Sequence, residues 1–110
     1  MYKCTVLYGH PDDADAFDRY YTQTHIPIAR GMEGLTGWTI TRLEPDADGN
    51  APAHHLVAEL CAESREALLA IFDSPEGRAA SADVHNFATG GATYLFGPVD
   101  TILPTPAGRD

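Results

Sequence analysis

The sequence has no long apolar run and few basic residues, and both shortages exclude classes of function. No stretch approaches the roughly 20 apolar residues that a membrane-spanning helix requires, so we expect no membrane partner. Seven lysine and arginine residues stand against 16 aspartate and glutamate residues, which gives a formal net charge of −9. Because this charge repels phosphate backbones and anionic lipid, we also expect no nucleic-acid partner.

Cysteine is scarce as well, and its placement excludes the metal sites that cysteine builds. Cys4 and Cys61 each lie within a predicted strand, and their spacing matches no zinc signature. We expect both to be small hydrophobic residues in a reducing compartment rather than a disulfide. His54 and His55 are adjacent, so in a regular strand they point to opposite faces and cannot both bind one ion. The sequence therefore predicts no metal site.

Two further kinds of signal are missing. The chain begins directly with a strand pattern, without the charged and apolar regions of a signal peptide, so we expect a cytoplasmic protein. Its glycines form no phosphate-binding fingerprint, and no Gly-x-Ser-x-Gly motif occurs. We therefore expect an activity that uses no cofactor.

What the chain does contain is a regular succession of strand and helix patterns. Its 110 residues, 44% of them hydrophobic, suit a single domain, which we place at residues 1–103, with a short tail at 104–110. The second helical unit is in two pieces, which begin at Ser64 and Ser74. Strands are predicted at 2–8, 38–43, 54–61 and 93–99, and the first helix at about 14–25. This βαββαβ order predicts an α+β, ferredoxin-like fold, a four-stranded antiparallel sheet with helices on one face.

The predicted strands carry apolar residues on both of their faces. Val6 alternates with Leu7 in the first strand, and Phe96 alternates with Leu95 in the last. Helices cover only one face of such a sheet, so the other face would remain exposed unless a second subunit covered it. We therefore expect a homodimer formed through the open sheet face.

The end of the first predicted helix, residues 17–28, combines aromatic residues with one histidine. One helical face is formed by Phe17, Tyr20, Tyr21, Thr24 and Ile28. His25 follows Tyr21 by four residues, so it borders this face. Pro27 lacks a backbone donor and clashes with the carbonyl of Gln23. We therefore expect the helix to end or kink beside His25 and to leave room for a small cavity.

His25 is the main candidate for catalysis, because an imidazole can transfer protons at physiological pH. Tyr21, one turn earlier, can orient this ring or donate to a substrate oxygen. Tyr20 and Tyr21 could together line a pocket for a flat organic ligand, or simply belong to the core. The alternative for His25 is a structural role, in which it satisfies a backbone carbonyl freed by Pro27.

Trp38 and Arg42 share one face of the second predicted strand. Arg42 could bind a carboxylate or a phenolate of a ligand. Alternatively, it pairs with an acid such as Glu59 or lies at the dimer interface. We take both Trp38 and Arg42 as candidate ligand-binding residues.

Three segments together resemble the EthD family, within the dimeric α+β barrel superfamily. They are the Tyr-x-x-x-x-His-x-Pro pattern around His25 with the following Gly34-Leu35, the strand at 55–60, and the stretch from Ser74 to Gly91. The resemblance covers about residues 2–99. One difference is Glu33, which stands where the family usually has proline before the Gly-Leu pair.

The resemblance implies a ferredoxin-like protomer whose open sheet face packs on a second copy, and a cleft near His25. Asp83 and Phe87 lie in the third segment and are added as candidate ligand-binding residues, whereas His85 is expected to be exposed. The family is linked to ether degradation in bacteria, and the superfamily includes isomerases, dehydratases, cofactor-free monooxygenases and haem-dependent enzymes. A haem would need an axial ligand in the cleft, and we expect none to bind.

Two functions remain open. The first is a cofactor-independent enzyme of secondary or xenobiotic metabolism, which uses His25 for acid–base chemistry on a small hydrophobic, oxygenated molecule. The second is a non-catalytic dimer that binds a small ligand or acts as an accessory protein. The first requires His25 and a tyrosine to converge on open space in the cleft.

Overall fold

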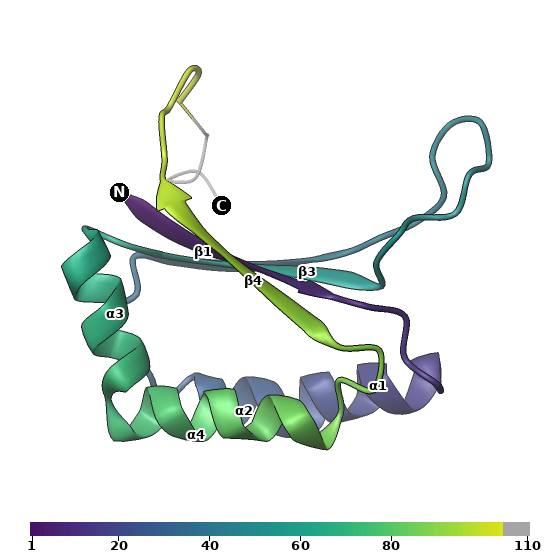
Figure 1. Ribbon diagram of the computed structural model, residues 1–110, viewed down its shortest axis with the longest axis horizontal. Coiled ribbons are helices and arrows are strands. Elements are labelled where there is room, and N and C mark those ends of the chain that lie inside the picture. The colour runs from purple at the N-terminus through teal and green to yellow at the C-terminus, as the bar shows by residue number, and fades with distance from the viewer. Residues whose placement is uncertain (105–110) are drawn as a thin grey trace.

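The computed structural model describes residues 1–104 and consists of one antiparallel sheet with helices along one face (Figure 1). The predicted tail at 104–110 lies almost wholly outside the described residues. The strands are β1 (Tyr2–Tyr8), β2 (Gly37–Arg42), β3 (Leu56–Ala62) and β4 (Ala92–Pro98), in the sheet order β2-β3-β1-β4. All three pairings are antiparallel, with β1 between β3 and β4. The ferredoxin-like fold predicted from the sequence is thus confirmed.

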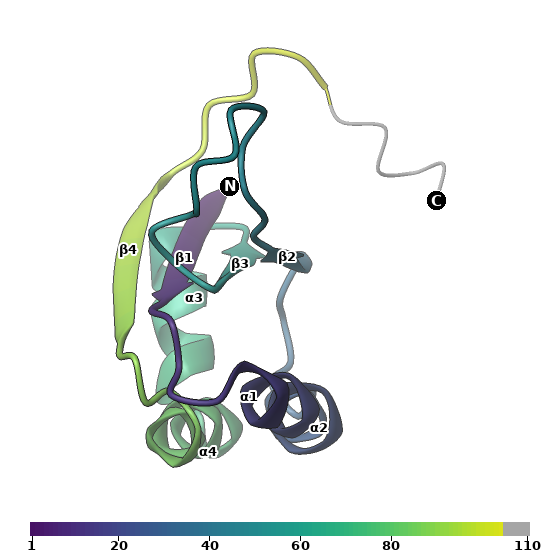
Figure 2. The same cartoon turned by 90° about the vertical axis from the view of Figure 1, so that its right-hand side faces the viewer.

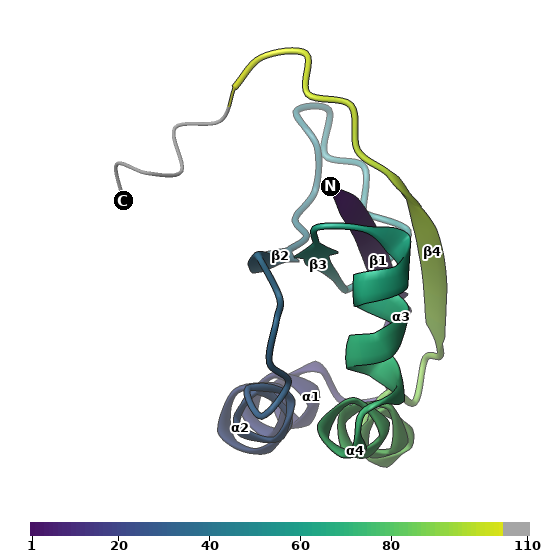
Figure 3. The same ribbon diagram turned by 90° about the vertical axis from the view of Figure 1, so that its left-hand side faces the viewer.

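The helices form a second layer beneath the sheet. One rod comprises α1 (Ala14–Tyr20), the π-helix η1 (Tyr21–His25) and α2 (Ile26–Ala29). A second rod comprises α4 (Pro75–Asp83) and the 3₁₀ turn η2 (Val84–Asn86), while α3 (Arg65–Asp73) links it to the sheet. Figures 2 and 3 show the two rods end-on, side by side, with α3 rising beside them. Within the described residues, no helix combines the length and apolar character needed to cross a membrane.

Short polar side chains begin these helices, and two of them, Ser64 and Ser74, are the helix starts that the sequence predicted. Asp13 accepts a hydrogen bond from the backbone N–H of Ala16, Ser64 from that of Ala67, and Ser74 from that of Gly77. Each cap satisfies a donor that the first turn of a helix leaves free. Ser74 ends α3 and starts α4, and Pro75 occupies the first turn of α4, where its missing N–H costs nothing.

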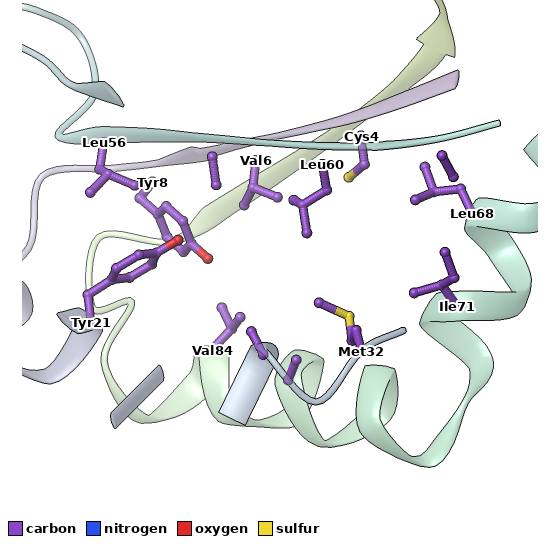
Figure 4. Close-up of a cluster of buried hydrophobic side chains, with 14 of the residues drawn as sticks. Cys4, Val6, Tyr8, Tyr21, Met32, Leu56, Leu60, Leu68, Ile71 and Val84 are labelled. Atoms are coloured by element: carbon purple, nitrogen blue, oxygen red, sulfur yellow. The ribbon is translucent and has the colours of Figure 1, made fainter. Parts of the chain in front are cut away.

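The core lies between the sheet and the helices, and strand alternation determines which residues enter it. Tyr2, Cys4, Val6 and Tyr8 are buried on the helix side, while the residues between them are only partly buried. β3 repeats the pattern with Leu56, Ala58, Leu60 and Ala62. Figure 4 shows Cys4, Val6 and Leu60 pointing from the sheet toward the helical layer, which contributes Met32, Ile71 and Val84. Cys4 and Cys61 are free and belong to opposite faces, because Cys4 pairs with Leu60 rather than with Cys61.

The open face of the sheet is of mixed character. The pairing register places Leu7, Val57 and Leu95 there, together with several threonines. Leu95 is 50% exposed, and the ion pair between Lys3 Nζ and Glu59 Oε2, 3.1 Å apart, lies beside it. The sheet therefore offers apolar area on both faces, as predicted, but the open face is not uniformly apolar.

The first helix was expected to end or kink beside His25, and it continues past Pro27 without ending. The chain widens into a π-turn from Tyr21 to His25, in which the N–H of Ile26 donates to the carbonyl of Tyr21, five residues earlier. It then resumes an α-helix with Pro27 in the first turn, a position that needs no donor. The helix is irregular beside His25, but the irregularity is an inserted π-turn rather than a break.

Candidate functional site

His25 is buried between the two helical rods, with 5% of its surface exposed. Its Nδ1 lies 2.9 Å from Oδ2 of Asp83, the last residue of α4. The imidazole therefore bonds to a carboxylate and not to a backbone carbonyl freed by Pro27. The π-turn that ends at His25 and the C-terminus of α4 position the two groups.

Asp83 is the centre of a small buried network. Its second oxygen, Oδ1, accepts hydrogen bonds from the Tyr20 hydroxyl at 2.6 Å and from Asn86 Nδ2 at 3.0 Å. Burial acts to raise the pKa of Asp83, but the hydrogen bonds from Tyr20, Asn86 and His25 outweigh it and hold the pKa below its usual value. Asp83 is therefore an ionised acceptor at neutral pH.

This arrangement fixes the role of each ring nitrogen of His25. Because an ionised carboxylate can only accept hydrogen bonds, Nδ1 must carry a proton and donate a hydrogen bond to Asp83. Nε2 has no hydrogen-bond partner among the described residues. No buried side-chain nitrogen or oxygen of those residues lacks a partner, so Nε2 keeps access to open space. When the ring is neutral, Nε2 carries the free lone pair.

The open space is a pocket of about 50 Å³ between the sheet and the helices, and His25 lines it. Its walls are largely apolar, from Val6, Leu60, Met32 and Val84, and three tyrosines and Ser81 add polar groups. A volume of this size holds a few water molecules. A larger ligand would have to displace a movable wall residue such as Met32, whose unbranched side chain adapts easily.

Tyr8 and Tyr21 place two hydroxyls in this pocket, and Figure 4 shows the two groups close together. Burial raises the pKa of Tyr21 to about 12, although the neighbouring Tyr8 hydroxyl acts in the opposite direction. Burial raises the pKa of Tyr8 further, and the neighbouring Tyr21 adds to this rise. Both phenols are thus protonated at neutral pH, and each can donate a hydrogen bond.

Aromatic rings hold the imidazole in place. The ring centroid of His25 lies 4.7 Å from that of Phe87 and 5.0 Å from that of Tyr21. Phe87 also packs on Tyr20 and on Phe17. Together with the bond to Asp83, these contacts restrict rotation of His25.

The structure sorts the predicted site residues into two groups. His25, Tyr21 and Trp38 line the pocket. Tyr20 and Phe87 instead line a separate surface groove, and Asp83 holds His25 from behind the ring. Direct binding of a ligand by these three residues stays a prediction. Their contacts with His25 and with each other support the position of the His25 ring.

Arg42 lies at the edge of the sheet and away from the pocket walls. Its guanidinium is 3.6 Å from Asp18, and both side chains are about half exposed, so the pair adds little stability. The expected pairing with Glu59 is wrong within the protomer. The strand register places Glu59 on the open face, where it pairs with Lys3, and Arg42 on the helix face.

The remaining histidines lie outside the pocket. His55 Nε2 is 2.9 Å from Asp18 Oδ1, and His10 Nε2 is 2.8 Å from the carbonyl of Pro52. His85 is exposed, as expected. Within residues 1–104, no group of three or more histidine, cysteine or acidic side chains is arranged to hold a metal ion.

Sequence reasoning missed the bond between His25 and Asp83 and the presence of Tyr8 in the pocket. The two bonded residues are 58 positions apart, and no periodicity connects them. Asp83 was singled out only through the family resemblance of its segment. For Tyr8, the available signal was its position at the end of a strand face that turns toward the helices.

Two proteins resemble this chain over nearly its full length. A curated relative from Rhodococcus erythropolis, an uncharacterized 11.0 kDa protein in the thcB-thcC intergenic region, is 39% identical over 104 residues, which cover 94% of this chain and all of the relative. A protein from Bacillus halodurans that is described as an EthD family protein is 31% identical, with a TM-score of 0.84, and the match covers 91% of this chain and 99% of that one.

More distant solved structures share the fold alone. SnoaB from Streptomyces nogalater, described as a cofactor-independent oxygenase, is 12% identical with a TM-score of 0.64, over 94% of this chain and 96% of that one. A dimeric protein of unknown function from Bacteroides fragilis, described as having a ferredoxin-like fold, is 9% identical with a TM-score of 0.65, over 89% and 95%. The model of the EthD domain matches residues 10–91, which include His25, Asp83 and both helical rods, and the chain therefore belongs to the EthD family.

Proposed function

We propose that this protein is a cofactor-independent enzyme that transfers a proton to or from a small hydrophobic, oxygenated molecule, with His25 as the acid–base group. One observation carries the proposal: Asp83 holds Nδ1 of His25, and Nε2 is left free beside an apolar pocket. A histidine fixed in this way by a carboxylate is oriented for proton transfer through its other nitrogen. We place this activity in the cytoplasm.

Each group in the site has a part in the proposed step. Nε2 of His25 accepts a proton from an acidic C–H or O–H of the substrate, and the electron pair moves onto the substrate oxygen. The hydroxyl of Tyr21, which is protonated at neutral pH, donates a hydrogen bond to that oxygen. Asp83 stabilises the positive charge that develops on the ring. Returning the proton to another carbon or oxygen completes an isomerisation or prepares a dehydration.

This chemistry needs only side chains that the chain itself supplies. A carbanion or phenolate formed in an apolar pocket is also the species that reacts with dioxygen in cofactor-free oxygenation. The description of the distant structure SnoaB as a cofactor-independent oxygenase is in keeping with such a use of the fold. The proposal therefore covers isomerase, dehydratase and monooxygenase reactions that begin with the same proton abstraction.

Proton exchange in heavy water tests the proposal without knowledge of the natural substrate. The probe is 2-tetralone, a neutral cyclic ketone fused to a benzene ring, whose C–H groups beside the carbonyl exchange slowly with solvent. We expect the purified protein, after dialysis against EDTA and without added cofactor, to accelerate deuterium incorporation measured by NMR. Exchange no faster than in buffer would contradict an acid–base role on this class of molecule.

The second candidate function is a non-catalytic protein that binds a small ligand in the same pocket. The largely apolar walls of the pocket would suit such a ligand without any proton transfer, once a movable wall residue such as Met32 gives way. Binding of 2-tetralone without acceleration of exchange would select this candidate. Acceleration that depends on His25 would select the enzyme.

We also propose that the protein is a homodimer through the open sheet face. Leu7, Val57 and Leu95 lie on this face, which no element of the described residues covers. Burying several hundred Å² of apolar surface per partner favours association at about 25 cal/mol per Å², before the entropy cost. We expect light scattering to give the dimer mass at micromolar concentration and Leu95→Lys to give the monomer mass. Parent protein that scatters as a monomer would exclude the dimer.

A further inference from the structure

A second hollow lies at the edge of the sheet, directly outside the pocket that holds His25. It is a groove of about 310 Å³ lined by Ile26, Arg30, Trp38, Thr39 and Ile40. β2, which supplies three of these residues, is an outer strand of the sheet. The groove therefore lies at the surface, along one side of α2.

Trp38 lines both the groove and the inner pocket. Along the first helical rod, His25 and Ala29 line the pocket, and the next residues, Ile26 and Arg30, line the groove. The two hollows thus lie along neighbouring strips of the same rod, and the indole ring of Trp38 lies between them. Movement of the Trp38 side chain is the shortest route by which they can join, and it would also enlarge the small pocket.

The groove contains a guanidinium group that has no carboxylate partner. Arg42 and Arg78 each have an acidic partner within 4 Å, and so does Lys3. Arg30 has none among the described residues, and neither do Arg19 and Arg65, but of these three arginines only Arg30 lines the groove. A free guanidinium beside apolar and aromatic surface matches a carboxylate attached to an apolar body, because it can form two parallel hydrogen bonds with that group.

We propose that the ligand of this site is an aryl or alkyl carboxylate, whose carboxylate binds Arg30 in the groove and whose apolar body passes Trp38 toward His25. The inference rests on the proposed function, because it assigns a substrate class to the same pocket. Arg30 follows His25 by five residues, on the order of 7 Å along a helix axis. This separation suits a carboxylate a few bonds away from the reacting atom.

Two probes of nearly equal shape separate charge from size: 3-phenylpropionate and its neutral amide, 3-phenylpropanamide. Trp38 is the only tryptophan of the chain, so its fluorescence reports occupancy of the groove and pocket. We expect the carboxylate to bind at least about 10-fold more tightly than the amide at low salt, as for a charge-assisted hydrogen bond. In Arg30→Gln we expect this preference to fall to nearly 1.

Arg19→Gln is the matched control, because it removes the same charge from an exposed site on α1 outside the groove. It should keep the carboxylate preference of the parent. Equal binding of the two probes to the parent, binding of neither, or a preference that survives Arg30→Gln would each overturn the inference. The exchange of neutral 2-tetralone does not involve Arg30, so it fails or succeeds separately and reports on the proposed function alone.

Discussion

Replacing His25 with glutamine is expected to lower the rate of 2-tetralone exchange by about 10²–10⁴-fold, the usual contribution of a side chain that transfers a proton. The glutamine amide can still donate to Asp83, so the buried carboxylate keeps a partner. It has no lone pair that can accept a proton at neutral pH in the place of Nε2. We therefore expect the melting temperature to change by only a few degrees.

His85→Gln is the control for this experiment, since His85 is an exposed histidine on η2, close to Asp83 in sequence. It should leave both the exchange rate and the melting temperature unchanged. A His25→Gln protein that loses much stability but still catalyses exchange would show that His25 has a structural role only.

Replacing Asp83 with alanine should cause the largest loss of stability. It removes one acceptor group from three donors, on His25, Tyr20 and Asn86. Breaking a buried, hydrogen-bonded pair by removing one member costs roughly 3 kcal/mol, because the remaining groups stay buried without partners. Denaturant unfolding measures the loss. Asp73→Ala, which breaks only an exposed ion pair with Arg78, should cost less than about 1 kcal/mol.

The loss in Asp83→Ala should depend on pH in a defined direction. The pKa of Asp83 is lowered in the folded protein, so its carboxylate stabilises the fold fully above the ordinary carboxyl pKa. This stabilisation disappears as pH falls through the lower value in the folded state. The free energies of unfolding of the parent and of Asp83→Ala should therefore differ most near neutral pH and approach each other below about pH 4. A difference that stays constant into acid would mean that the charge of Asp83 contributes nothing.

The strands and caps could be predicted from the sequence because each depends on residues close to one another in the chain. The alternation in 2–8 gives β1 its bounds, and Ser64 and Ser74 begin the two helices that they were expected to begin. Pro27 was harder to interpret, because a proline can be accommodated either by a break or by a π-turn. The choice depends on how the rod packs against α4, which is not a local property.

The candidate site was only half predictable for the same reason. His25 and Tyr21 were identified from one helix, and both line the pocket. The groups that complete the site come from elsewhere: Asp83 from the end of α4 and Tyr8 from the end of β1. Only the packing of two helical rods under the sheet brings these groups together, and this packing cannot be inferred from the spacing of residues in the sequence. Arg42 was predicted to face a ligand, whereas Arg30 is the arginine that lines the groove beside the pocket.

The tautomer of His25 tests the central claim most directly, and it requires no substrate. Nitrogen-15 NMR of the protein at pH 9 distinguishes a ring nitrogen that carries a proton from one that does not. We predict that Nδ1 carries the proton, because it donates to Asp83, and that Nε2 is unprotonated and free to accept one. The same spectrum of Asp83→Ala should lose this strict preference. A parent protein with the proton on Nε2 would contradict the account, because the nitrogen that lies at the pocket could then accept no proton.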